Sequence, residues 1–557
     1  MKRQIRIALV VAVVAGTSGA AVALASSASA ATVSHPFPYH VTYRTGVLPS
    51  ASPAARDAAV KKQYDSWKST YLVAGCASGQ YYVSTKGDGD APNNGTVSEA
   101  QGYGMNIVPL MAGYDANAKT EFDGLWNLVK THEDGQGMMQ WQLDGKTCKY
   151  ADSGTPDGAT DGDLDIGYGL ILADRQWGGY TNDAMTWLSH FYAADVASDG
   201  HLKCEDDGPT TDTRPSDWML DHLRAFEAFD PAHDWNKVVT KTQNLAQEFT
   251  AAYSPNANLL SDFVVNANTT SPKPAPANYQ EDQPDNIVGY NSLRVPWHMG
   301  TDALLYGNSV SKAIATKESA SYKSHSGGDP TKVYPHTKLD GTPYTTDDQA
   351  EEAGDSVGPS AMAAGDQAWT DTIWNYLGTN PFGDGYFGET IKMLVYIVMA
   401  GDYWSPNDSV TPSPSASVPA SPSTSPSTPP SVIHVEAETG TISSGGTVDT
   451  NHNGYSGAGF VNVANAVGSY VEIAVNGATA GSHTLTFRYS NGTTSTRPVD
   501  IAVNGAAVGS LTFGTTVDWD TWTTVTFAAT LTAGTNRIRL TSTTANGGPN
   551  VDWLEVS

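Results

Sequence analysis

The segment 405–431 divides this chain, because it consists almost entirely of proline, serine, threonine and alanine. Such a composition cannot bury a core and forms an extended spacer. Residues 31–404 carry nearly all the lysines and acidic residues, whereas residues 432–557 contain no lysine. At 557 residues the chain is also too long for one ordinary core. We therefore expect two separately folded domains joined by a linker.

The first 30 residues have the pattern of a secretory signal peptide. Basic residues at positions 2, 3 and 6 precede an apolar stretch, and the small residues 28–30 supply a cleavage pattern. A membrane anchor is the alternative, but residues 16–19 interrupt the apolar stretch with glycine, serine and threonine. We expect a secreted, extracellular and soluble protein that begins near residue 31.

The formal net charge of −27 limits the partners of this chain. An acidic surface disfavours nucleic acid, because phosphate groups require Lys and Arg. It suits a cationic ligand such as chitosan, although many acidic secreted proteins are merely soluble. We expect a monomer that binds neither nucleic acid nor membrane.

Three cysteines, Cys76, Cys148 and Cys204, allow at most one internal disulfide. Secretion permits such a bond. The spacing does not indicate which two cysteines pair.

Residues 31–404 repeat apolar residues at helical spacing, and no strand-like runs separate the repeats. The pattern predicts an all-α domain. The predicted helices span 54–71, 101–114, 119–131, 164–177, 182–196, 218–228, 235–253, 301–319, 360–377 and 386–400.

Residues 432–557 are rich in Thr, Val, Gly, Ala and Asn, and segments such as 482–489 and 523–530 alternate between polar and apolar positions. Asn504-Gly505 is a hairpin turn signal. Short strands at regular spacing predict an all-β sandwich of jelly-roll type.

Three aspartates, Asp161, Asp163 and Asp165, crowd the start of the helix predicted to end at Trp177. A single carboxylate there could simply interact with the positive end of the helix dipole. Like charges this close raise one another's pKa, which a structural cap does not require. From these residues alone, a catalytic and a structural role are equally open.

The same segment, Ala159-Thr-Asp-Gly-Asp followed by an apolar helix and Trp, resembles the signature of glycoside hydrolase family 8. Only Gly167 departs from it, where the family usually has Ala. Ser98-Glu99-Ala-Gln-Gly-Tyr-Gly-Met resembles the motif that carries the family's proton donor. The resemblance implies an (α/α)6 barrel of six inner and six outer helices. It also implies that Glu99 is the general acid and that Asp161 holds the distorted sugar and stabilises its developing positive charge.

Glu99 also has a structural interpretation, because Thr96-x-x-Glu99 has the spacing of a helix capping box. Gly102 and Gly104 favour the catalytic one, since they leave space beside the helix where a ligand could approach. Both interpretations are compatible.

The general base is less evident, because Asn291 stands where much of the family has a catalytic Asp. A subgroup of chitosanases and β-1,4- or mixed-linkage glucanases shares this Asn, and its base is a Glu in a preceding loop. Glu281 matches that position best, with Asp282 and Asp285 as competitors. The resemblance implies inversion, with the two carboxyl groups about 6.5–9.5 Å apart.

Aromatic and polar residues in the matching motifs are candidates for substrate binding. Tyr103, Trp141 and Trp297 are predicted sugar platforms, although a Trp lies more often in a core. Asp217 is a weak indication of an amino sugar. His298 replaces a usual Arg with unknown effect. The predicted substrate-binding residues are Tyr103, Trp141, Asp217, Asn291, Arg294 and Trp297.

The C-terminal region resembles carbohydrate-binding module families 6 and 35 in its Glu-Ala-Glu start, its 454–460 and 488–492 segments and its Val-Asp-Trp end. The resemblance implies a structural Ca²⁺, held by oxygen ligands from both chain ends. The predicted metal ligands are Glu436, Glu438 and Asp552, and the predicted sugar-site residues are Tyr455, Trp519 and Asn550. Trp522 competes with Trp519.

These motifs predict an endo-acting, inverting glycosidase that needs no cofactor for catalysis and hydrolyses β-1,4 links of chitosan. The first alternative is an endo-β-1,4-glucanase or lichenase acting on cellulose derivatives or mixed-linkage glucan. The second is a glycan-binding protein without activity, suggested by the missing Asp at position 291.

Overall fold

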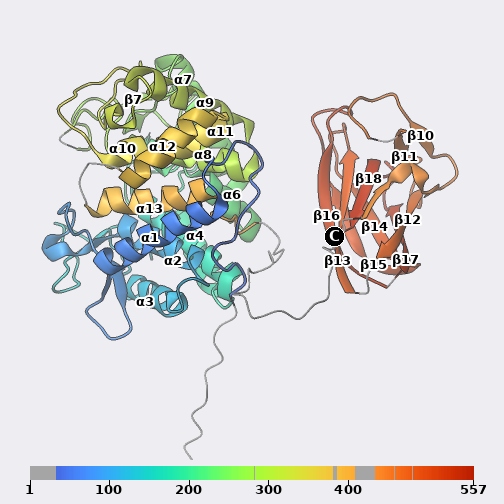
Figure 1. The fold of residues 1–557 in the computed structure, drawn as a ribbon, viewed down its shortest axis with the longest axis horizontal. Coiled ribbons are helices and arrows are strands. Elements are labelled where there is room, and N and C mark those ends of the chain that lie inside the picture. The colour runs from blue at the N-terminus through green and yellow to red at the C-terminus, as the bar shows by residue number, and fades with distance from the viewer. Residues whose placement is uncertain are drawn as a thin grey trace, which may run out of the picture. The chain divides into compact units, whose positions relative to one another are not determined.

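The computed structural model describes residues 33–281, 283–379, 385–407, 433–456, 458–478, 481–532 and 534–556. The predicted signal peptide and most of the predicted linker lie outside these residues. The chain divides after Ala416 into two compact units, one mainly helical and one of β-strands (Figure 1).

The first unit is a helical barrel, as predicted. Its helices are α1 (Pro53–Tyr71), α2 (Ser98–Leu110), α3 (Ala118–Lys130), α4 (Thr160–Trp177), α5 (Thr181–Ala194), α6 (Leu220–Phe229), α7 (Trp235–Tyr253), α8 (Val295–Tyr306), α9 (Ser309–Ser326), α10 (Glu351–Asp355), α11 (Val357–Ala364), α12 (Gln367–Thr379) and α13 (Tyr386–Ala400). Short strands also occur, contrary to prediction: β1 (Leu72–Ala74), β2 (Tyr81–Val83), β3 (Thr96–Val97), β4 (Gln142–Leu143), β5 (Asp212–Thr213), β6 (Val264–Val265) and β7 (Lys273–Pro274).

Inner and outer helices alternate along the chain. Helices such as α2, α4 and α8 are buried along almost their whole length. Helices such as α3 and α7 bury one face only, which is the pattern of an amphipathic surface helix. The inner ring consists of α2, α4, α6, α8, α11 and α13, and the outer ring of α1, α3, α5, α7, α9 and α12.

Close packing of α2 against α4 explains one glycine in each motif, Gly102 and Gly162. A Cβ atom on Gly102 would collide with the Cβ atom of Asp165, and one on Gly162 would collide with the backbone of Ser98. The space beside Gly102 is therefore occupied by α4. The prediction that this space admits a ligand is wrong.

Each of the predicted helices 301–319 and 360–377 corresponds to two separate helices in the structure. α8 ends at Gly307 in the left-handed conformation, and the Asn308 side chain caps the start of α9. Gly365 ends α11 in the same way. Both breaks let the chain turn from the inner to the outer ring.

The segment 33–50 crosses the barrel at the carboxyl ends of its inner helices. Its backbone amides donate to Ala112 after α2, Leu304 in α8, Met362 in α11 and Gly401 after α13. The starts of these helices are thereby left free at the opposite end.

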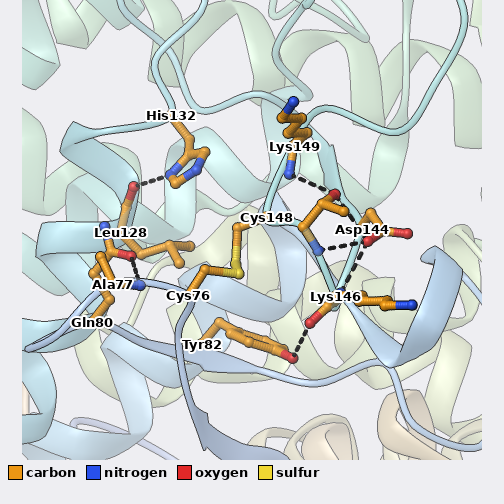
Figure 2. Close-up of a disulfide and its surroundings, with 12 residues drawn as sticks. Cys76, Ala77, Gln80, Tyr82, Leu128, His132, Asp144, Lys146, Cys148 and Lys149 are labelled. Carbon is orange, nitrogen blue, oxygen red and sulfur yellow. Dashed lines mark hydrogen bonds between the residues drawn. A yellow bond between two sulfur atoms is a disulfide. The ribbon is translucent and has the colours of Figure 1, made fainter.

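One disulfide, Cys76–Cys148, links the loop after β1 to the loop after β4, across 72 positions of sequence (Figure 2). The Asp144 carbonyl accepts the Cys148 amide at 2.7 Å and thereby turns the second loop. Cys204 is not disulfide-bonded. Among the described helices, none has the length and apolarity that a membrane span requires.

The second unit is a sandwich of two antiparallel sheets around its own apolar core. One sheet has the order β10-β11-β18-β13-β16, with β8 also on β18, and the other β15-β14-β17-β12-β9. Asn504 and Gly505 form the β14–β15 turn with positive φ, as predicted. The strands are β8 (Ile433–Glu436), β9 (Thr441–Ile442), β10 (Thr447–Asp449), β11 (Phe460–Asn462), β12 (Tyr470–Ala478), β13 (Gly481–Ser490), β14 (Arg497–Val503), β15 (Ala506–Phe513), β16 (Thr523–Leu531), β17 (Gly534–Ser542) and β18 (Asn550–Val556).

Candidate active site

A cleft of about 760 Å³ lies where the inner helices begin. Its walls come from the starts of α2, α4 and α13, from α10, and from the loop before α8. The acidic residues in its described lining are Asp88, Asp90, Glu99, Asp161, Glu281, Glu351 and Glu352, and the basic ones are Arg214 and Arg294.

Glu99 lies in the first turn of α2 and points into this cleft. Its carboxylate accepts hydrogen bonds from the Arg294 guanidinium and from the Tyr386 hydroxyl. Burial raises the pKa of Glu99 to about 8, and Arg294 opposes this shift. A carboxyl group that keeps its proton at neutral pH can act as a general acid.

The predicted capping box does not form at this helix. Thr96 belongs to strand β3 and its hydroxyl donates to the Val97 carbonyl, while α2 begins at Ser98 with no side-chain cap. The rigid mounting of Glu99 instead comes from the contact between α2 and α4.

Asp161 lies at the start of α4 and is ionised. Burial alone would raise the pKa of this carboxyl group, but Arg214 and Arg294 lower it to about 2. Its Oδ1 forms an ion pair with Arg214 at 2.9 Å, and its Oδ2 accepts a hydrogen bond from Arg294 at 3.1 Å. A fixed negative charge on this wall of the cleft can stabilise a cationic sugar.

The guanidinium of Arg294 is 2% exposed and connects the two sides of the site. Besides Glu99 and Asp161, it donates to the Tyr103 hydroxyl at 3.1 Å and to Asn291 Oδ1 at 3.3 Å. Arg294 thus positions both carboxylates, and because it also lines the cleft, its predicted contact with substrate stays a prediction.

Glu281 lines the same cleft as Glu99. The Asn291 amide donates to Glu281 Oε1 at 3.0 Å, and the Gln283 amide donates to Oε2 at 2.7 Å. Asn291 therefore holds a carboxylate in the region where much of the family has one of its own.

Asp285 and Asp282 were the other candidates for the general base. Asp285 is fully buried, and its Oδ2 accepts the backbone amides of residues 279–281 at 2.6–3.1 Å. It shapes the turn that carries Glu281 and does not line the cleft. Asp282 lies outside the described residues.

Two predicted sugar platforms need correction. Tyr103 and Trp297 are buried and pack against each other at a tilt, with ring centroids 5.8 Å apart, and neither residue lines the cleft. His298 is also buried and stacks on Trp297 at 4.3 Å. Trp141 is half-buried and lines the cleft, so its role as a platform stays a prediction.

Asp217 also needs correction as a substrate contact. It is fully buried and accepts two hydrogen bonds from Arg214 Nε, at 2.9 and 3.0 Å. Because Arg214 already pairs with it and it does not line the cleft, Asp217 gives no indication of an amino sugar.

The sequence motifs missed three aromatic residues of the cleft, Tyr290, Tyr386 and Phe387. Tyr290 lies directly before Asn291, so its motif contained the signal. Tyr386 and Phe387 begin α13, far from any matched motif, and only the barrel brings them beside Glu99.

The predicted sugar-site residues of the β-unit lie on neighbouring loops. The loop carrying Tyr455 is joined to the loop carrying Trp519 by a 2.8 Å hydrogen bond from the backbone N–H of Asn453 to Asp520 Oδ1. Trp519 and Trp522 are both half-buried, and Asn550 is buried at the start of β18. Tyr455 and Trp519 therefore offer more accessible surface than Asn550.

The three predicted metal ligands converge in part. Glu436 and Asp552 both accept from the Ser456 hydroxyl, at 2.9 and 3.4 Å, and the Ala458 amide donates to Glu438 Oε1 at 2.8 Å. The buried Glu438 Oε2 has no hydrogen-bond partner among the described residues. Asp552 also forms an ion pair with Arg488.

Comparison with known proteins shows the family to which this chain belongs. A model of glycosyl hydrolases family 8 matches residues 35–401, which contain Glu99, Asp161 and Glu281. The chain belongs to glycoside hydrolase family 8. It is therefore a glycoside hydrolase of the endo-acting type, and the alternative of a glycan-binding protein without activity is not supported.

Two relatives of this family 8 chain are named as β-glucanases. A β-glucanase of Niallia circulans is 36% identical over 385 residues, covering 66% of this chain and 91% of that relative. The structure of a β-1,3-1,4-glucanase from Paenibacillus sp. X4 is 35% identical with a TM-score of 0.63, covering 67% of this chain and 100% of that one.

Residues 436–557 match the model of carbohydrate binding module family 6. An exo-β-D-glucosaminidase of Amycolatopsis orientalis is 49% identical over 123 residues, which cover 22% of this chain and only 12% of that relative. The family 8 enzyme therefore carries a carbohydrate-binding module C-terminal to its catalytic unit in sequence.

Proposed function

We propose that this enzyme is an endo-β-glucanase that hydrolyses β-1,4 links in cellulose derivatives and mixed-linkage glucan with inversion. The observation that carries the proposal is the placement of Glu99 and Glu281 in one cleft of a barrel whose full-length relatives are β-glucanases. Chitosan, our first prediction, lacks such support from the catalytic unit.

In the proposed reaction, protonated Glu99 transfers its proton to the glycosidic oxygen as the bond from that oxygen to the anomeric carbon breaks. A water attacks the anomeric carbon from the opposite face, and Glu281 accepts the proton that this water loses. Asp161 stays ionised and stabilises the positive charge that develops on the sugar ring. Proton exchange with solvent then restores both glutamates.

Matched variants test these roles. We expect Glu99→Gln and Glu281→Gln each to lower kcat by about 100-fold or more, because each removes one proton transfer. Glu227→Gln is the control, since Glu227 is exposed on α6 and outside the cleft. Reducing-sugar release from carboxymethyl cellulose measures the effect, and unchanged turnover in either glutamate variant would contradict the assignment.

Chitosan remains the second candidate substrate, because one observation favours it. Seven acidic and two basic side chains line the described cleft, and such a surface attracts a cationic polymer. A panel of lichenan, carboxymethyl cellulose and chitosan separates the two proposals. We expect the highest kcat/KM on a glucan, whereas hydrolysis of chitosan alone would replace the first proposal by the second.

We also propose that the β-unit binds a Ca²⁺ ion through Glu436, Glu438 and Asp552. Support comes from the unpartnered buried oxygen of Glu438 and from the preference of Ca²⁺ for carboxylates. The ion would join the first strand to the last and stabilise the fold. Adding EGTA should lower the Tm of the β-unit, and Glu438→Gln should abolish that response. An identical Tm with and without EGTA would refute the site.

We further propose that the enzyme acts outside the cell as a monomer. The signal-like segment 1–30 supports secretion, as does the disulfide, because such bonds persist in oxidising compartments. Size-exclusion chromatography of the secreted protein tests the oligomeric state.

A further inference from the structure

The loop that carries Glu281 is held from two directions. From behind, the Asp285 carboxylate accepts three consecutive backbone amides of residues 279–281. From the side, Asn291 and Gln283 each donate one hydrogen bond to the Glu281 carboxylate. Each carboxylate oxygen can accept two hydrogen bonds, so each keeps one position for a water.

Beyond Gln283 the hydrogen bonds continue into a distant part of the chain. Gln283 Oε1 contacts His336 Nε2 at 3.3 Å, and His336 Nδ1 contacts Asp348 at 3.1 Å. The Tyr290 hydroxyl donates to the same carboxylate at 3.1 Å. Because Tyr290 precedes Asn291 in sequence, the chain of contacts returns to Glu281 and closes a ring.

The backbone joins the segment that carries His336 to the segment that carries Tyr290 and Asn291. The amide and carbonyl groups of Val288 and Thr337 exchange two hydrogen bonds of 2.9 and 3.2 Å. The His336 ring packs edge-on against the ring of Tyr290, with centroids 5.4 Å apart. His336 is therefore placed by its own segment as well as by Gln283.

Gln283 acts through both ends of its side-chain amide. The amide nitrogen donates to Glu281 Oε2 at 2.7 Å, and the amide oxygen lies against His336 Nε2. The second imidazole nitrogen, Nδ1, lies against Asp348 Oδ2. The Gln283 amide and the His336 imidazole therefore link the Glu281 carboxylate to the Asp348 carboxylate.

We propose that Gln283 and His336 are positioning residues for the general base: His336 orients the Gln283 amide, which holds the Glu281 carboxylate toward the attacking water. This inference rests on the proposed role of Glu281. It assigns a catalytic consequence to the segment 333–350, which contains no residue of the matched motifs.

Three variants and a control test the proposal by kcat and KM on the best soluble substrate. We expect Gln283→Ala and His336→Ala each to lower kcat by about 10- to 100-fold with KM within about threefold, because a misplaced base slows the chemical step. His325→Ala is the control, since the hydrogen bonds of His325 to described residues stay within its own helix α9, outside the ring. It should behave as the unmodified enzyme.

The double variant Gln283→Ala/His336→Ala separates positioning from general structural damage. If His336 acts through Gln283, the double variant should lose no more kcat than Gln283→Ala alone, within about twofold. Multiplied losses, or an unchanged kcat in His336→Ala, would overturn the proposal. Should His336→Ala unfold, Asp348→Asn replaces it, because the Asp348 side chain is 36% exposed. A several-fold loss of kcat is then expected, and an unchanged kcat refutes the ring.

Glu281→Gln distinguishes the two levels of failure. Loss of turnover in Glu281→Gln with no effect of the ring variants refutes the positioning roles and leaves the base intact. Full turnover in Glu281→Gln refutes the base itself, and the positioning roles with it.

Discussion

Tyr386 donates its hydroxyl to Glu99, although no motif pointed to it. A hydrogen bond to a carboxylate stabilises the ionised form and lowers the pKa, so Tyr386 opposes the increase that burial causes. Because the acid must be protonated, kcat/KM should fall as pH rises through the pKa of Glu99. Tyr386→Phe should therefore move this alkaline limb upward by about one pH unit. A pH profile of kcat/KM measures the shift, and Tyr192→Phe, outside the cleft, should leave it unchanged. A downward shift would contradict this account.

At the scale of elements, the contact between α2 and α4 sets the spacing of the two catalytic helix starts. Gly102→Ala would push a methyl group into Asp165, which cannot move without displacing α4. We expect a loss of about 1–3 kcal/mol in the free energy of unfolding and a lower kcat. Gly135→Ala is the matched control, because its added Cβ would meet nothing within 4 Å. Equal stability of the two variants in urea unfolding would show that the contact is not tight.

At the scale of the whole molecule, the two units have separate cores and should function separately. A chain that ends at residue 407 should hydrolyse a soluble glucan with kcat/KM within about twofold of the full chain. On an insoluble polymer it should be slower, because the module no longer raises the local enzyme concentration. Tyr455→Ala/Trp519→Ala in the full chain should reproduce that loss. Equal rates of all forms on insoluble polymer would exclude targeting by the module.

The sequence predicted the two fold classes, because helical and alternating periodicities are local properties. The family resemblance also assigned Glu99, Asp161 and Glu281 to one active site, and all three line one cleft. The helix breaks at Gly307 and Gly365 were missed, although left-handed glycines commonly end helices.

Exposure and long-range contacts were harder to predict. The side chains of Tyr103 and Trp297 lie in the barrel wall and not in the cleft. Their burial results from contacts with other helices, which the motifs do not indicate. Asp217 forms an ion pair with Arg214 at i,i+3 spacing, but the sequence does not indicate that this pair is buried away from the cleft. His336 reaches the site from a loop about 50 residues after Gln283, and such contacts depend on the complete fold.

The crossing of the inner helix ends by residues 33–50 has a practical consequence. Ser34 bonds to Gln176 at the end of α4, whereas Asp161 lies at its start. An α-helix rises 1.5 Å per residue, so the 15 residues from Asp161 to Gln176 separate these points by about 22 Å. Immobilisation of the enzyme through a tag fused before residue 33 would anchor the base of the barrel to the support. The catalytic face would then remain turned toward the surrounding liquid.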